Sequence, residues 1–159
     1  MQQRHNIDPV WDGNSRVLIL GSFPSVKSRE AEFFYAHPQN RFWRVLAAVF
    51  ETEVPVTAEQ KRTFLLQNNI ALWDVCAGCS IEGSADSTIR NAVANDVAPI
   101  LSQAPIGRIF VNGKTAAALY RKLLEPVLGR TAICLPSTSP ANAAVSLSEL
   151  IEVWRCVRG

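Results

Sequence analysis

Four short apolar runs divide the chain, and a residue that favours turns follows each of them. The runs span residues 17–20, 70–73, 109–111 and 131–135, and they are followed by Gly, Asp, Asn and Pro. Short continuous runs of this kind are typical of strands buried on both faces, as in a parallel sheet. We therefore expect a parallel sheet of four strands.

Amphipathic helical patterns lie between these runs. Residues 42–49 and 116–123 carry apolar side chains at the spacing i, i+3, i+4 and i+7. Thr57 with Gln60, and Ser146 with Glu149, form capping boxes that predict two helix starts. The order βαβαβαβα with right-handed crossovers predicts an α/β fold: a three-layer α/β/α sandwich around the sheet, with residues 1–159 as one domain. In such folds ligands bind at the carboxyl ends of the strands.

Composition and charge exclude several classes of protein. The 16 basic and 14 acidic residues give a net charge of +2, so any contact with nucleic acid needs a local patch. No apolar run approaches the roughly 20 residues that span a bilayer, and the first residues form no signal peptide, so we expect a cytoplasmic protein without a membrane partner. Cys76 and Cys79 form a single Cys-x-x-Cys without a second pair, which favours structural thiols and predicts no metal or cofactor.

The loop after the first run has the sequence Gly-Ser-Phe-Pro-Ser and spans residues 21–25. Its glycine permits a tight turn, and its backbone N–H groups could bind carbonyl or phosphate oxygens. The loop lacks the glycine patterns of dinucleotide sites and P-loop NTPases. A turn that binds no ligand is the alternative interpretation.

Residues 33–43 combine aromatic, amide and basic side chains. Phe42 and Trp43 fit the apolar face of a helix. Tyr35 comes before a proline turn at the carboxyl edge of the sheet, where it could stack on a flat ligand. Asn40 stands where the next helix is expected to begin, so it is either an N-cap or a catalytic amide.

Polar residues also follow the other three runs. Asp74 could accept a hydrogen bond from a base, act as a general base or cap a loop. Asn112 could read the edge of a base or occupy a turn, and Lys114 adds a positive charge beside it. The loop 136–143 is rich in hydroxyl groups and small side chains that suit a phosphate backbone.

These loops together resemble the uracil-DNA glycosylase superfamily. The segment 35–43, Tyr-Ala-His-Pro-Gln-Asn-Arg-Phe-Trp, is similar to that of the mismatch-specific uracil and thymine glycosylases. The loop 21–25 and the segment 135–143, Leu-Pro-Ser-Thr-Ser-Pro-Ala-Asn-Ala, are most similar to the hypoxanthine-DNA glycosylase branch. Residues 110–114 resemble the family's third strand edge, and the similarity extends from about the first strand to the last helix.

The resemblance implies roles for individual residues. Related glycosylases place Asp or Asn two residues after the first-loop glycine to position water, but here that residue is Phe23, so the resemblance implies that Asn40 is catalytic. The implied base-binding residues are Gly21, Ser22, Phe23, Tyr35, Asp74 and Asn112. The implied DNA-contacting residues are Lys114, Ser137, Thr138, Ser139 and Asn142.

The implied activity is that of a monofunctional DNA glycosylase. It would flip a deaminated base out of DNA, hypoxanthine in preference to uracil or xanthine, and hydrolyse the N-glycosidic bond as a monomer. Three alternatives stay open. Lys114 could form a Schiff base and nick the strand. The chain could be a non-catalytic nucleotide- or DNA-binding module. A hydrolase built on Ser22, Ser137 or Cys76 is the least supported, because His5 and His37 are the only histidines.

Overall fold

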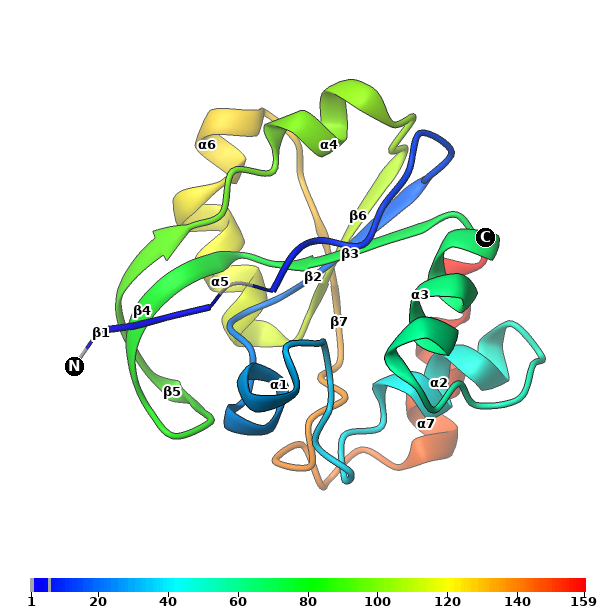
Figure 1. Cartoon of the computed structure of the whole chain (residues 1–159). Helices are drawn as coiled ribbons and strands as arrows, with labels where there is room; N and C mark the ends of the chain where they lie inside the picture. The colour runs from blue at the N-terminus through cyan, green and yellow to red at the C-terminus, as the bar shows by residue number, and fades with distance from the viewer. Residues whose placement is uncertain (1, 6) are drawn as a thin grey trace.

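The computed structural model describes residues 2–5 and 7–159 (Figure 1). Its strands are β1 (Gln2–Arg4), β2 (Val17–Gly21), β3 (Ile70–Asp74), β4 (Cys76–Glu82), β5 (Ala85–Ala94), β6 (Arg108–Asn112) and β7 (Ile133–Leu135). Its helices are α1 (Val26–Ala31), α2 (Phe42–Val49), α3 (Ala58–Gln67), α4 (Ala98–Gln103), α5 (Lys114–Leu123), α6 (Glu125–Leu128) and α7 (Leu147–Trp154), and the 3-10 helix η1 (Arg155–Val157) follows α7.

The four apolar runs of the sequence form one parallel sheet in the order β3-β2-β6-β7. Each face of this sheet is covered by helices. Side chains such as Ile19 and Leu72 pack against α2, α3 and α7, whereas Leu18 and Val111 pack toward α4 and α5 on the other face. The two groups of helices lie on opposite sides of the sheet in Figure 1. The predicted α/β/α sandwich around four parallel strands is confirmed.

A second, antiparallel sheet was not predicted from the sequence. Strands β1, β4 and β5 form it in that order, and β4 follows β3 after one residue, Val75. The predicted order βαβαβαβα is therefore incomplete. The sequence does not predict this second sheet because β5 has half-buried and exposed positions rather than an apolar run. This sheet carries Asp86 to the edge of the parallel sheet.

The structure also places the cysteines and helix starts. Cys76 and Cys79 are buried and free within β4, and among the described residues no cluster of His, Cys, Asp and Glu could hold a metal ion. Both capping boxes are confirmed, at α3 and α7. Helix α2 has Arg41, not Asn40, at its N-cap position, although the Asn40 side chain accepts from the Phe42 N–H. Within residues 2–5 and 7–159, none of the helices has the length and apolarity needed to span a bilayer.

Candidate active site

A cleft of about 980 Å³ opens at the carboxyl ends of the parallel strands. Its size falls within the usual range for sites that enclose a small organic group. The loops that follow β2, α1 and β7 meet at this end of the sheet (Figure 1). The cleft is lined by residues within 21–28, 34–40, 84–87, 112–115 and 134–145, and by Asp74.

Gly21 forms the floor of the cleft at the end of β2. A Cβ atom added there would lie 2.5 Å from Asp74 Oδ1 and 2.8 Å from the Tyr35 hydroxyl. Neither distance leaves room for a methyl group. The absence of a side chain at residue 21 therefore lets a carboxyl group and a phenol come together over one point of the backbone.

The two residues after Gly21 present backbone donors. Within the described residues, the N–H groups of Ser22 and Phe23 donate to no protein acceptor. The Ser22 hydroxyl donates to Asp86 Oδ2 at 2.8 Å, which ties the loop to β5. The Phe23 ring is buried, packs edge-on against His5 and lies beneath the Arg29 guanidinium. Phe23 can therefore contact a ligand in the cleft through its backbone N–H rather than through its ring.

Tyr35 is held at the cleft with left-handed backbone geometry, at φ 50°. One face of its ring stacks on Phe42, with the centroids 4.0 Å apart and the planes 15° from parallel. A ligand that stacks on this ring must therefore use the face opposite Phe42. Neighbouring backbone groups anchor the segment, since the Ala36 N–H donates to Ser28 Oγ and the Trp43 indole donates to the Phe34 carbonyl. An uncommon φ held by its surroundings is a frequent feature of ligand sites.

Asn40, Thr138 and Asn112 form one hydrogen-bonded chain along the cleft. Asn112 exchanges two hydrogen bonds with Thr138, and its Nδ2 also donates to the Tyr35 hydroxyl at 3.2 Å. The Thr138 hydroxyl donates to Asn40 Oδ1 at 2.9 Å. Thr138 is fully buried, so its hydroxyl supports Asn40 and Asn112 within the protein, and its expected contact with DNA stays a prediction. Both N–H groups of Asn112 Nδ2 are also occupied, which leaves Oδ1 as the atom through which Asn112 could reach a base.

The loop after β7 is clamped by Arg41. The guanidinium of Arg41 donates to the carbonyl oxygens of Ser139, Asn142 and Val145 at 3.2, 3.0 and 2.5 Å. The Arg41 N–H donates to the Thr138 carbonyl at 3.1 Å. Five donors in a fixed planar fork suit several carbonyl oxygens at once. Sequence reasoning did not single out Arg41, because its partners lie about 100 residues away along the chain.

Asp74 is a buried carboxyl group without a charged partner. Its side chain is 3% exposed, its Oδ2 has no hydrogen-bond partner, and no basic group of the described chain forms an ion pair with it. Burial, and secondarily the charge of Asp86, raises the pKa of Asp74 to about 8. Burial also raises the pKa of Asp86 and of the Tyr35 hydroxyl. At neutral pH Asp74 is therefore mainly a neutral acid, which can donate as well as accept.

This raised pKa predicts that stability falls as pH rises. Between pH 4 and 8 Asp74 binds a proton in the folded state, whereas an unfolded Asp, with a pKa of about 4, does not. Each pH unit in that window therefore costs up to about 1.4 kcal/mol of folding free energy. Asp74→Asn does not ionise, so its stability relative to the unsubstituted chain should increase from pH 5 to pH 8. Urea unfolding at both pH values checks this, and a constant difference would contradict it.

The structure brings the other sequence candidates together at the same cleft, which Thr138 also lines. Gly21, Ser22, Phe23, Tyr35, Asn40, Asp74, Asn112, Lys114, Ser137, Ser139 and Asn142 all line it. Lys114 is exposed at the start of α5 and Asn142 donates to the Ser137 carbonyl. Sequence reasoning missed Asp86, because an isolated Asp between Ala and Ser has no distinctive pattern. Only the pairing of β4 with β5 carries it to the site.

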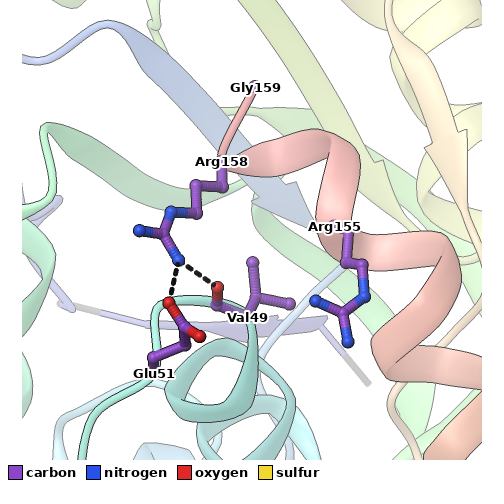
Figure 2. Close-up of a pocket in the computed structure, with 5 residues that line it drawn as sticks. All are labelled: Val49, Glu51, Arg155, Arg158 and Gly159. Carbon is purple, nitrogen blue, oxygen red and sulfur yellow. Dashed lines mark hydrogen bonds and ion pairs between the residues drawn. The ribbon is translucent and has the colours of Figure 1, made fainter.

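A second, smaller pocket of about 350 Å³ lies near the C-terminus (Figure 2). Its Arg158 donates to Glu51 Oε2 at 3.0 Å and to the Val49 carbonyl at 3.1 Å. Arg108, the first residue of β6, contacts the carbonyl oxygens of Cys156 and Val157. The pocket therefore lies toward the amino ends of the strands. Arg158 is already paired with Glu51, so it is not available to bind a ligand in this pocket.

Known proteins resemble the chain over most of its length. The model of the Uracil DNA glycosylase superfamily matches residues 9–157. Hypoxanthine DNA glycosylase of Methanosarcina acetivorans is 36% identical over 149 residues, 93% of each chain. The protein of that name from Methanosarcina barkeri is 33% identical, over 88% of this chain and 89% of its own. The solution NMR structure of a candidate uracil DNA glycosylase from Methanosarcina acetivorans superposes with a TM-score of 0.81 and 34% identity over 100% of both chains.

Proposed function

The chain belongs to the Uracil DNA glycosylase superfamily and is a DNA N-glycosylase, and we propose that it acts as a monomer to release a deaminated base, hypoxanthine in preference to uracil or xanthine, from DNA. Two relatives named hypoxanthine DNA glycosylase, each at least 33% identical, support this choice of base. The product is an abasic site, because the proposed activity does not cut the strand.

One observation carries the proposal, namely the group of side chains and N–H donors that share the cleft. The face of Tyr35 opposite Phe42 can stack on a flipped base, and such stacking contributes about 1–3 kcal/mol. Asp74 and the N–H groups of Ser22 and Phe23 can meet the polar edge of that base. Asn40 lines the same cleft from the start of α2. Ser137, Ser139, Asn142 and Lys114 are the proposed contacts to the DNA strand.

The proposed reaction is a hydrolysis in which the C1′–N9 bond breaks and the electron pair leaves with hypoxanthine. The oxygen of a water molecule bonds to C1′, the water loses a proton to solvent, and the base gains one. The sugar passes through an oxocarbenium-like state that attracts even a weakly activated water. The protein has two tasks, which are to orient the water and to stabilise the charge on the departing base. Donors aimed at developing charge typically lower a barrier by about 3–4 kcal/mol each.

Asn112 contributes less directly to the proposed site. Its Nδ2 is occupied by Thr138 and Tyr35, so its proposed contact with the base uses Oδ1. Its main contribution is to hold Thr138 and the Tyr35 hydroxyl in place. A base that presents a ring N–H, as hypoxanthine, uracil and xanthine do, could donate to that oxygen.

A glycosylase assay tests the proposal. Duplexes that carry hypoxanthine, uracil, xanthine or thymine opposite each normal base are incubated with the protein and then treated with alkali. We expect cleavage after alkali on the hypoxanthine duplexes first and no strand break without alkali. Release of no base from any duplex, combined with binding of all of them, would indicate a non-catalytic DNA-binding module. Strand cleavage without alkali would instead point to Lys114 as a Schiff-base nucleophile.

A further inference from the structure

The orientation of the Asn112 side chain is fixed by a backbone donor. The Thr138 N–H donates to one end of this amide at 3.1 Å, and a backbone N–H cannot accept. That end is therefore the oxygen, and the other end is Nδ2. Asn112 Nδ2 then donates to the Thr138 hydroxyl at 3.0 Å. The Thr138 hydroxyl therefore accepts the hydrogen bond from Asn112 and does not donate to it.

The proton of the Thr138 hydroxyl has one partner in the described chain. It is donated to Asn40 Oδ1 at 2.9 Å. The Phe42 N–H donates to the same oxygen, also at 2.9 Å. A carboxamide oxygen has two lone pairs, and here both are occupied by protein donors. A flipped Asn40 would set its own N–H groups against the Phe42 N–H, so the flipped orientation is excluded.

The end of the Asn40 amide that is left for a ligand is consequently its nitrogen, because its oxygen already accepts two hydrogen bonds. The side chain lines the cleft and is half-buried, and within the described residues its Nδ2 donates to no protein acceptor. We infer that Asn40 holds the attacking water as a hydrogen-bond donor through Nδ2, and that Thr138 is the positioning residue whose hydroxyl, together with the Phe42 N–H, holds the amide in this orientation. The inference rests on the proposed glycosylase function. The water accepts from Nδ2 with one lone pair and attacks C1′ with the other.

The Asn40→Asp variant tests whether residue 40 holds the water as a hydrogen-bond donor or as an acceptor. The Asp side chain keeps an oxygen for Phe42 and Thr138 but replaces the N–H groups with a second oxygen. We expect single-turnover release of hypoxanthine to fall by about 100-fold or more, as for the loss of one aimed donor. A rate equal to or above that of the unsubstituted chain would overturn the inference, because the water would then be held by an acceptor.

Thr138 is tested with a matched pair of variants. Thr138→Ser keeps the hydroxyl, and its rate should stay within about threefold of the original. Thr138→Val keeps the shape but removes the hydroxyl, and kcat should fall by about 10-fold or more with KM nearly unchanged. Binding of a duplex with an abasic-site analogue, and urea unfolding, show whether the Val variant is folded and binds. A folded Val variant with an unchanged kcat would overturn the positioning role.

The unsubstituted chain is assayed first on the hypoxanthine duplex. If it releases no base, the proposed function fails and the variants are not interpreted. If it releases hypoxanthine and Asn40→Asp does so equally well, only the inference about Asn40 and Thr138 fails. The two results are therefore distinguishable in one experiment.

Discussion

Asn40→Ala is expected to lower the single-turnover rate of hypoxanthine release by about 100-fold or more, which is the usual effect of removing one aimed polar group. The alanine removes the carboxamide that lines the cleft just before α2. It also leaves the Phe42 N–H and the Thr138 hydroxyl without their acceptor. Unfolding should therefore become easier by about 1–3 kcal/mol. Rates and urea unfolding measured on the same sample separate the two effects.

The matched control is Gln39→Ala at the preceding residue. Gln39 is exposed and lies outside the cleft lining, so its loss should change neither rate nor stability appreciably. Binding of the Asn40→Ala variant to the hypoxanthine duplex should stay close to that of the unsubstituted chain, because the amide acts on the water rather than on the DNA. Full turnover by this variant would remove Asn40 from the mechanism.

Gly21→Ala should have an effect of similar size for a steric reason. The new Cβ would lie 2.5 Å from Asp74 Oδ1 and 2.8 Å from the Tyr35 hydroxyl, so at least one of these groups must move. Both belong to the proposed base-binding surface. We expect kcat/KM on the hypoxanthine duplex to fall by about 100-fold, since small displacements in a site have effects of this order. Overpacking should also destabilise the fold by about 1–3 kcal/mol.

Gly13→Ala is the control for this substitution. A Cβ there would come no closer than 3.9 Å to the Gln103 carbonyl oxygen, and neither glycine has a positive φ. The two variants thus carry the same chemical change in different surroundings. Wild-type kinetics for Gly21→Ala would show that the space above residue 21 plays no part in base binding.

The sequence predicted the parallel sheet well because its strands are marked by their own side chains. The runs at 17–20, 70–73, 109–111 and 131–135 are apolar on both faces. The two capping boxes, each formed by residues three positions apart, predict the starts of α3 and α7. The antiparallel sheet was missed because β5 exposes many of its residues, so its strand character depends on pairing with β4. Asp86, which lies on that strand, was missed with it.

Family resemblance pointed to Asn40, Tyr35 and the loop after β7, but it could not distinguish side chains that face the cleft from those that support it. Thr138 illustrates the difference. In the sequence it is one of three adjacent hydroxyl residues, and nothing local separates it from Ser137 and Ser139. In the structure it is the one that is fully buried, with its hydroxyl between Asn112 and Asn40.

The sequence by itself determined the α/β architecture and the edge of the sheet where the cleft lies, because strand burial and helix capping depend on residues close together in the chain. Tertiary structure alone decided which end of the Asn40 amide is occupied by protein donors, why Gly21 has no room for a side chain, and why the pKa of Asp74 is raised. Each of these properties depends on contacts between residues far apart in sequence, since hydrogen-bond direction, close packing and loss of solvent arise only when distant segments meet.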